Sequence, residues 1–234
     1  MKLAVIPARG GSKRIPNKNI RNFCGHPMIA WSIIAAQKSN CFDHIIVSTD
    51  DQDIADISKK YGADVPFFRP AELADDYTPI RFVINHAIQY AIDNIGAPSH
   101  TCHIQATAPF CTPEILQNSL SHMETHNIDF IFSCGSFPYP IQRALTINNE
   151  GRAKMISPEN YFSRSQDLEE TFHDAGQFYW GTTKAFLTGK SIFTMNNLPW
   201  IIPRHLVQDI DTEEDWKRAE LMFQALHGKT YDPL

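Results

Sequence analysis

Short apolar segments alternate with segments of helical periodicity through the first 134 residues, and this alternation constrains the fold more than any other feature. Apolar runs typical of buried strands lie at 3–6, 44–49, 64–68, 101–105 and 129–134. Apolar residues at helical spacing between them predict helices at 27–38, 52–61, 80–92 and from residue 112 onward. The pattern predicts an α/β fold with a doubly wound, mostly parallel, Rossmann-like sheet.

The alternation stops after Cys134. Between 135 and 175 the sequence is rich in Pro, Asn, Ser and charge, and 148–151 is typical of a hairpin turn between two short strands. We interpret 135–175 as an insertion that reaches away from the sheet and serves as a substrate lid or a subunit contact. A length of 234 residues suits a single domain, 1–234, that carries this insertion.

Secondary structure returns after the insertion. Strand character is expected at 177–180, with short extended segments at 200–202 and 206–208. The last helix is predicted at 213–226, where Thr212 and Asp215 have the spacing of a capping box.

A glycine pair in a cationic loop follows the first expected strand. Gly10 and Gly11 can adopt backbone angles closed to other residues, so their amide groups can turn toward one anion. The loop also carries four cations, which add charge-assisted contacts: Arg9, Lys13, Arg14 and Lys18. The chain has a net charge of −5, so this loop is an exception to its acidic background. These features predict that the loop binds a triphosphate. The loop has neither the Walker A spacing nor the G-x-G-x-x-G spacing of known phosphate-binding loops. The alternative interpretation is a surface turn whose charges are solvated.

Two carboxylates flank one apolar residue just before the last helix. In an extended segment this spacing places Asp209 and Asp211 on the same side of the chain. Paired carboxylates beside phosphates form a site for a hard cation, of which Mg²⁺ is the usual occupant. The alternative is that both are additional acids at the N-terminus of the helix.

Composition excludes several classes of protein. The net charge of −5 argues against a nucleic-acid partner, and no apolar run is long enough for a membrane span. The chain starts without a signal-peptide pattern, so we expect a cytoplasmic protein. Its five cysteines include no C-x-x-C pair and its ten histidines no H-E-x-x-H motif, so neither a disulfide framework nor a zinc site is indicated.

Taken together, these motifs resemble the acylneuraminate cytidylyltransferase family, the CMP-sialic acid synthetases. The stretches that carry the resemblance span the chain in order: IPARGGSK at 6–13, PNKN at 16–19, VSTD at 47–50, RPAELA at 69–74, QATAP at 105–109 and DIDT at 209–212. Within the family the chain is most similar to the subgroup that activates pseudaminic acid. That similarity is carried by FPYPIQRA at 137–144, RSQDLEE at 164–170 and HDAGQFYW at 173–180.

The resemblance implies a fold of the nucleotide-diphospho-sugar transferase type and a Mg²⁺-dependent reaction. In it, the anomeric hydroxyl of a nine-carbon α-keto acid sugar attacks CTP, giving CMP-pseudaminic acid and pyrophosphate. It also implies a homodimer formed through 135–175. The family's catalytic cations correspond to Arg9, Lys13 and Lys18. Its nucleotide-binding positions correspond to Ala8, Gly10, Gly11, Ser12, Asn19, Arg69 and Thr78. Its sugar-binding positions correspond to Gln105, Thr107, Arg164, Asp174 and Gln177, and its metal ligands to Asp209 and Asp211.

Two alternatives remain beside this reading. One is a CMP-synthetase for another acidic sugar, such as N-acetylneuraminic or legionaminic acid. The other is a non-catalytic nucleotide-binding regulator, which predicts losses among the cations or the aspartate pair. Arg9, Lys13, Lys18, Asp209 and Asp211 are all present, which favours the enzyme.

Overall fold

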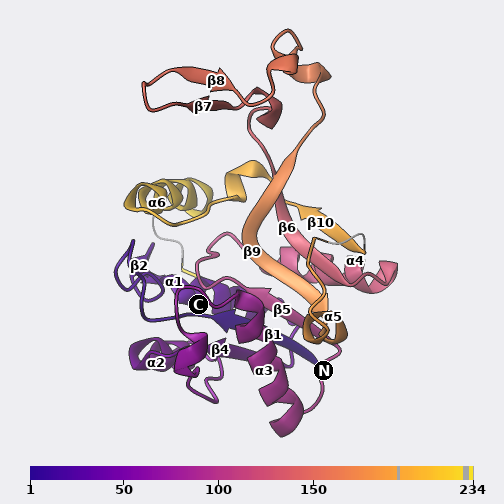
Figure 1. Cartoon of the computed structure of the whole chain (residues 1–234). Helices are drawn as coiled ribbons and strands as arrows, with labels where there is room; N and C mark the ends of the chain where they lie inside the picture. The colour runs from indigo at the N-terminus through magenta and orange to yellow at the C-terminus, as the bar shows by residue number, and fades with distance from the viewer. Residues whose placement is uncertain (194–195, 229–231, 234) are drawn as a thin grey trace.

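A six-stranded sheet runs through the middle of the protein in this computed structural model, which describes residues 1–193, 196–228 and 232–233 (Figure 1). The strand order is β10-β6-β9-β5-β1-β4, and only β9 is antiparallel to its neighbours within this sheet. Its strands are β1 (Lys2–Pro7), β4 (His44–Ser48), β5 (His100–Ile104), β6 (Phe130–Ser136), β9 (Phe172–Thr182) and β10 (Asn197–Ile201). The predicted mostly parallel α/β sheet is confirmed.

Helices cover both faces of the sheet. They are α1 (Met28–Lys38), α2 (Gln52–Lys60), α3 (Ile80–Asn94), α4 (Pro113–His126), α5 (Thr183–Leu187) and α6 (Glu213–His227). Successive residues of β1 point to opposite faces: Ala4 and Ile6 pack with α1, α2 and α4, whereas Leu3 and Val5 pack with α3 and α5. The sheet is therefore doubly wound, as the alternation predicted. No helix in the described part of the chain is long and apolar enough to cross a membrane.

One predicted strand was wrong, and one predicted extended segment is only partly extended. The segment 64–68 makes only isolated bridges, at Asp64 and Phe68, because Pro66 between them has no N–H to donate to a ladder. In the segment 206–208, Leu206 belongs to a 3₁₀ turn at Arg204–Leu206, whereas Val207 is extended as predicted. The sequence also gave no sign of helix α5 or of the two-residue ladder β2 (Asn22–Phe23) and β3 (His26–Pro27).

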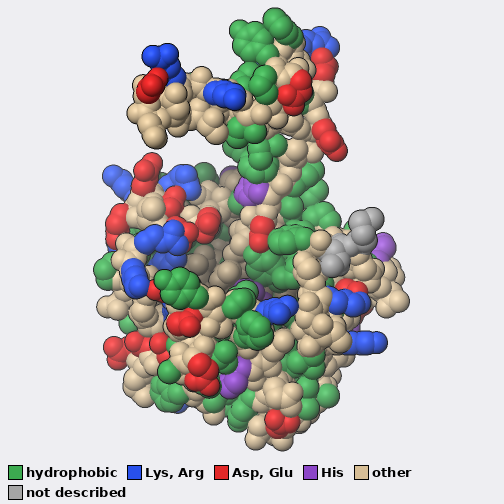
Figure 2. All heavy atoms as spheres, in the orientation of Figure 1, with side chains coloured by type: hydrophobic (Ala, Val, Ile, Leu, Met, Phe, Trp, Pro, Cys, Tyr) green, Lys and Arg blue, Asp and Glu red, His purple; other side chains and the backbone are tan. Residues whose placement is uncertain are grey.

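Residues 137–171, which we call the arm, leave the sheet between β6 and β9 and stand clear of the body (Figures 1 and 2). The arm contains the antiparallel hairpin of β7 (Leu145–Ile147) and β8 (Ala153–Met155), so the predicted hairpin is confirmed. The rest of the arm consists of loops and three 3₁₀ turns, at Ile141–Arg143, Pro158–Asn160 and Ser165–Asp167. Many of its apolar side chains are exposed, among them Tyr139, Leu145, Ile147, Ile156, Tyr161 and Phe162.

The C-terminal helix returns to the N-terminal part of the chain. Trp216 and Phe223 of α6 pack edge-on against Phe23, with ring centroids 5.5 and 5.4 Å apart. Thr212 and Asp215 form the predicted capping box at the start of this helix. This packing brings the DIDT segment beside the loop that follows β1.

Candidate active site

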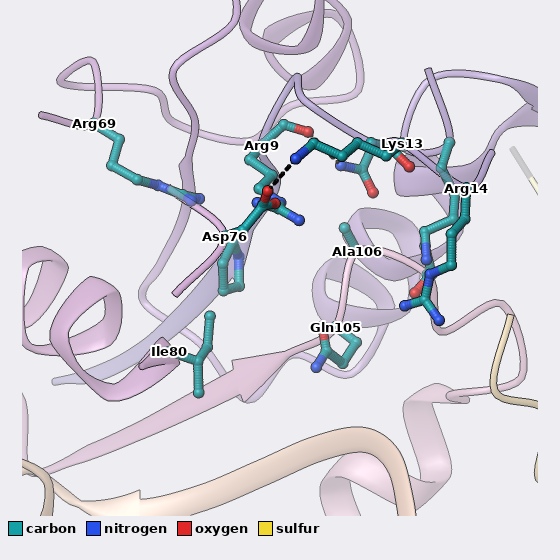
Figure 3. Close-up of a pocket in the computed structure, with 13 residues that line it drawn as sticks. Arg9, Lys13, Arg14, Arg69, Asp76, Ile80, Gln105 and Ala106 are labelled. Carbon is teal, nitrogen blue, oxygen red and sulfur yellow. Dashed lines mark hydrogen bonds and ion pairs between the residues drawn. The ribbon is translucent and has the colours of Figure 1, made fainter. Parts of the chain in front are cut away.

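A cavity of about 470 Å³ opens where β1 and β5 end (Figure 3). Arg69 lies on one side of the cavity and Arg14 on the other, with Arg9, Lys13 and Asp76 between them. Its walls also include Pro7, Ser12, Lys18, Asn19, Ile80, Gln105, Ala106 and Thr107. Since the carboxyl ends of parallel strands meet at one edge of a sheet, residues almost a hundred positions apart share this space.

The glycine pair shapes the loop after β1 in a different way from the one predicted. Neither Gly10 nor Gly11 has a left-handed backbone; the positive φ in this loop belongs to Asn17, at 53°. Gly10 is instead needed for close packing, because a Cβ there would lie 2.5 Å from the Asp51 carboxylate. Its amide donates to Asp50 Oδ1 at 3.1 Å. The Gly10 amide therefore attaches the loop to the segment just after β4. The absence of a side chain at Gly10, not an unusual backbone angle, allows the two segments to pack this closely.

One carboxylate joins two cations of this loop. Asp76 accepts from the Lys13 ammonium at 2.5 Å and from the Arg9 guanidinium. These bonds from Lys13 and Arg9 hold the pKa of Asp76 below its usual value. Asp75 fixes the same turn by accepting from the amides of Tyr77 and Thr78, at 2.9 and 2.6 Å. Without a bound anion, the protein itself supplies the negative charge that these two cations require.

A second carboxylate does the same for the other two cations. Asp211 Oδ1 lies 2.9 Å from the Arg14 guanidinium and 3.2 Å from the Lys18 ammonium. Lys18 also donates to the carbonyl oxygen of Ile210 at 2.7 Å. The cationic loop and the DIDT segment, almost 200 residues apart in sequence, therefore form one electrostatic unit.

Two polar side chains are built into the wall of the cavity. Arg69 is only 6% exposed, and its guanidinium donates to the Ser48 hydroxyl at 3.1 Å and to the Ser48 carbonyl. Burial lowers the pKa of Arg69 from its ordinary value, although the group stays charged at neutral pH. Asn19 donates to the carbonyl oxygen of Arg9 at 3.0 Å. Both contacts hold the loops that surround the cavity in place.

A further cavity, of about 400 Å³, lies between the start of β9 and the segment before α6. We call it the second cavity. Its lining includes Ser136, Pro138, His173, Asp174, Ala175, Arg204, Val207, Gln208, Asp209 and Arg218. The carboxylate of Asp174 accepts from the Tyr179 hydroxyl at 2.6 Å and from the Gly176 amide at 2.8 Å. Burial and the nearby Asp174 raise the pKa of Tyr179, so its hydroxyl remains a donor.

Gln177 is buried beside this cavity, with 2% of its surface exposed. Its side-chain amide donates to the carbonyl oxygen of Leu206 at 2.5 Å. Its backbone carbonyl accepts from the Gln105 amide at 2.9 Å. Gln177 thus connects the end of β5 to the turn that precedes Asp209.

The predicted site residues fall into three groups: those that line the first cavity, those that line the second, and those that line neither, which include Ala8, Gly10, Gly11, Gln177 and Asp211 as well as Thr78 and Arg164. Those that line the first cavity are Arg9, Ser12, Lys13, Lys18, Asn19, Arg69, Gln105 and Thr107. Asp174 and Asp209 line the second cavity. Thr78 donates its hydroxyl to the Glu72 carbonyl at 3.0 Å and Arg164 pairs with Asp167 at 2.7 Å, and neither lines a cavity described above.

The sequence analysis did not identify Asp76, Arg204 or Arg218, and it placed Arg14 among the cations of the phosphate loop without a catalytic role. Asp76 carried a usable signal, because an acidic residue beyond a strand end can complete a cluster of cations. The other two come from 3₁₀ and helical segments whose spatial neighbours no local pattern reveals.

Asp209 and Asp211 are the groups that could hold a metal ion. Burial and the neighbouring Asp211 carboxylate raise the pKa of Asp209, a sign of two like charges held close together. No cluster of three or more Asp, Glu, His or Cys able to hold a metal exists in the described part of the chain. The donor set therefore fits a hard cation that takes its other ligands from phosphate oxygens and water, as Mg²⁺ does.

Comparison with known proteins gives concordant results. The family model described as cytidylyltransferase matches residues 3–224. The chain is 41% identical to a pseudaminic acid cytidylyltransferase of Campylobacter jejuni, over 98% of this chain and 99% of that protein. It is 32% identical to a CMP-N,N'-diacetyllegionaminic acid synthase of Legionella pneumophila, over 95% of this chain and 96% of that protein.

Among solved structures, the fold is similar to that of CMP:2-keto-3-deoxy-manno-octonic acid synthetase in complex with CTP. The TM-score is 0.68 with 16% sequence identity, covering 96% of this chain and 99% of that one. A 4-diphosphocytidyl-2C-methyl-D-erythritol synthase from Anaerococcus prevotii gives a TM-score of 0.62 with 13% identity, over 95% of this chain and 98% of that one. At these identities the similarity establishes the fold alone.

Proposed function

The chain belongs to the cytidylyltransferase family, and from this premise we propose that it transfers the cytidylyl group of CTP to pseudaminic acid. The anomeric hydroxyl of the sugar acid attacks the α-phosphorus of CTP. The bond from that phosphorus to the bridging oxygen breaks, and pyrophosphate leaves. CMP-pseudaminic acid is the second product. The chain's similarity to a pseudaminic acid cytidylyltransferase over almost its whole length supports this acceptor.

The observation that carries the proposal is the first cavity, where four cations of the loop after β1 converge. Nucleotidyl transfer places little covalent demand on a protein, because positioning and charge stabilisation supply most of the catalysis. Arg9, Lys13 and Lys18 bind the triphosphate and stabilise the charge that develops on the leaving pyrophosphate. Asp76 gives up its two cations to the incoming phosphates.

The nucleoside is assigned to the opposite side of the same cavity. The buried guanidinium of Arg69 is held by Ser48 and donates to the cytosine carbonyl. Contact with the nucleotide is proposed for the side chains of Asn19 and Ser12 and for the backbone at Ala8, Gly10 and Gly11. Thr78 belongs to the turn that selects the base, and its hydroxyl would have to leave the Glu72 carbonyl to reach a ligand in the cavity.

Asp209 and Asp211 bind Mg²⁺ in this proposal. When bound, the ion would supply positive charge beside the phosphates and would favour loss of the proton from the attacking hydroxyl. Asp211 must first release Arg14 and Lys18, which leaves both cations available to the phosphates. The chain's own residues therefore exchange partners when the charged substrates arrive.

The sugar is assigned to the region between the two cavities. Gln105 and Thr107 line the nucleotide side of this region and Asp174 the far side. Direct contact with the sugar is also proposed for Gln177 and Arg164. The latter has to give up its ion pair with Asp167.

We also propose that the protein is a homodimer formed through the arm. Many apolar side chains of the arm are exposed in the single chain. Exposed apolar patches of this kind mark protein interfaces. In Figure 2 an open gap separates the arm from the body beneath it, where a second chain can enter.

A single assay tests the reaction. The protein is incubated with CTP, Mg²⁺ and, in turn, pseudaminic, legionaminic and N-acetylneuraminic acid, and pyrophosphate release is followed. Release with pseudaminic acid at the highest kcat/KM is expected. Asp211→Asn should abolish release, whereas the control Glu214→Gln, at an exposed acid in the first turn of α6, should not. If no acid gave pyrophosphate release, the proposed enzymatic activity would be refuted. A higher kcat/KM with N-acetylneuraminic acid would refute pseudaminic acid as the proposed acceptor.

A further inference from the structure

Arg204 differs from every other arginine and lysine that lines the two cavities. In the first cavity Arg9 and Lys13 pair with Asp76, Arg14 and Lys18 pair with Asp211, and Arg69 is bound to Ser48. In the second cavity Arg218 lies 3.1 Å from the Asp215 carboxylate and donates to Gln208 at 3.0 Å. For the Arg204 guanidinium the described part of the chain provides neither a hydrogen bond nor an ion pair; the hydrogen bond that Arg204 accepts, from the Val207 amide, is to its backbone carbonyl.

The backbone that carries Arg204 is fixed, although its side chain is not. Arg204 begins a 3₁₀ turn at Arg204–Leu206, in which the Leu206 amide bonds to the Pro203 carbonyl at 2.9 Å. The Leu206 carbonyl in turn accepts from the buried Gln177 side chain. A buried hydrogen bond of this kind holds the turn against β9, so the free guanidinium is presented from a rigid support.

One of the two carboxylates that line the second cavity is already engaged. Both oxygens of Asp174 accept hydrogen bonds, from the Tyr179 hydroxyl and the Gly176 amide. The other carboxylate, Asp209, lies five residues after Arg204 and is one of the two proposed metal ligands. An unpaired guanidinium in such a cavity is a binding group for an external anion that has planar, bidentate geometry.

The proposed acceptor carries such an anion at a fixed place. In the cyclic form of an α-keto acid sugar, the anomeric carbon bears both the attacking hydroxyl and the carboxylate. The carboxylate must therefore lie within a few bonds of the reacting oxygen, close to the residues that hold the metal. The second cavity contains Asp209 and Arg204 together, which satisfies this geometric requirement.

We propose that Arg204 binds the carboxylate of the acceptor sugar in the second cavity and so orients its anomeric hydroxyl. This inference rests on the proposed function and deepens it by naming the residue that recognises the carboxylate of the sugar. Arg164, the carboxylate partner that the family resemblance suggests, is paired with Asp167 and lines neither cavity. Gln177 acts as a positioning residue through the turn that it holds.

The test is steady-state kinetics of Arg204→Gln with both substrates varied. Loss of one partner of a hydrogen-bonded charge pair should raise the KM for the sugar acid by about 30-fold or more, with the KM for CTP nearly unchanged. Arg204→Lys should recover part of the loss. Lys217→Gln, an exposed cation on α6 outside the second cavity, is the matched control and should behave like the wild type.

The methyl ester of the sugar acid separates charge recognition from a structural effect. The wild type should prefer the free acid strongly, whereas Arg204→Gln should accept acid and ester with similar kcat/KM. An unchanged KM for the acid in Arg204→Gln, or an equal loss for acid and ester, would overturn the inference. So would the same pattern appearing in Arg164→Gln instead. A wild-type protein that binds CTP but transfers its cytidylyl group to no sugar acid would refute the proposed function. An active wild type whose KM for the sugar acid is the same as that of Arg204→Gln would refute only the role of Arg204.

Discussion

Two internal carboxylates neutralise the four cations of the loop after β1, and each of them bridges a pair. Asp76 joins Arg9 to Lys13, and Asp211 joins Arg14 to Lys18. The ion pairs are partly or largely exposed to water, so each contributes little to the stability of the fold. Their larger effect is on binding, because a charged substrate has to compete with them.

Replacement of Asp76 by Asn should strengthen CTP binding. The triphosphate no longer competes with an internal carboxylate for Arg9 and Lys13, and because exposed ion pairs are weak the gain should be about two- to fivefold. Isothermal titration with CTP measures it, and cytidine, which has no phosphates, should bind both proteins equally. Asp53→Asn, an exposed acid on α2, is the control variant. Weaker CTP binding in Asp76→Asn would mean that Asp76 orients the two cations for the phosphates rather than competing with them.

His103 gives a second prediction at the scale of one residue. It is 3% exposed on β5 and its ring stacks on that of Tyr179, with centroids 5.1 Å apart. Burial lowers the pKa of His103 to about 3. Below the ordinary histidine pKa of about 6.5 the unfolded chain therefore binds a proton that the native chain does not. Acid favours unfolding through this residue until the pH falls to the native pKa.

His103→Phe keeps a flat ring and removes this proton. Between about pH 7.5 and about pH 4.5 the wild type should lose about 2–3 kcal/mol more unfolding free energy than the variant, at about 1.4 kcal/mol per pH unit below the unfolded pKa. Urea unfolding at the two pH values measures the difference. Parallel pH dependence in the two proteins would show that His103 is not kept neutral by its burial.

At the scale of elements, the loop after β1 depends on a close approach to the start of α2. Asp51 caps α2 by accepting from the Ile54 amide at 3.0 Å, and it also lies against Gly10. The same carboxylate therefore caps the start of α2 and limits the size of a residue in the neighbouring loop. The sequence suggested that Gly10 is needed for its backbone angles, whereas the structure needs it because a larger residue would not fit between the loop and the start of α2.

Gly10→Ala should destabilise the protein by about 1–3 kcal/mol, the usual range for a side chain forced into occupied space. The new Cβ would lie 2.5 Å from the Asp51 carboxylate and would displace the helix cap. Gly11→Ala is the matched variant, since nothing lies within 4 Å of the added carbon, and its unfolding free energy should stay near that of the wild type. Urea denaturation of both variants decides the matter; equal stability for the two would show that the loop moves freely away from α2.

At the scale of the whole molecule, the strand order brings distant segments to one edge of the sheet. β1 lies between β4 and β5, so the cationic loop, the VSTD segment and the QATAP segment meet there. The antiparallel β9 extends beyond this edge and carries the arm with it. α6 then packs on the N-terminal region and completes the site with Asp211.

The arm gives a prediction about assembly. In the proposed homodimer its apolar surface is covered by a second chain, so light scattering should give twice the 26.6 kDa mass of one chain. Ile147 on the hairpin is 73% exposed in the single chain, and Ile147→Asp should shift the protein toward monomer. Ile95→Asp, at an exposed apolar position at the end of α3, should not. A monomeric wild type, or an Ile147→Asp protein that remains fully dimeric, would contradict the proposed interface.

The sequence by itself determined the parts of this protein that depend on local chemistry. Apolar periodicity located the main strands and the helices α1 to α4 and α6, because burial of one face requires a regular spacing. Turn and capping residues located the β7–β8 hairpin and the start of α6 for the same local reason. The cations of the first loop and the aspartate pair stood out as charges set beside apolar segments.

Only the tertiary structure decided which of these charges meet. The pairing of Asp76 with Arg9 and Lys13, the binding of Lys18 to Asp211, and the unpaired state of Arg204 depend on strand order and on the packing of α6. Short segments such as 64–68 and 204–208 were also decided by their surroundings, since a few residues carry too little periodicity to specify a conformation. Contacts between residues far apart in sequence arise from the collective burial of the core, which no single stretch of the chain encodes.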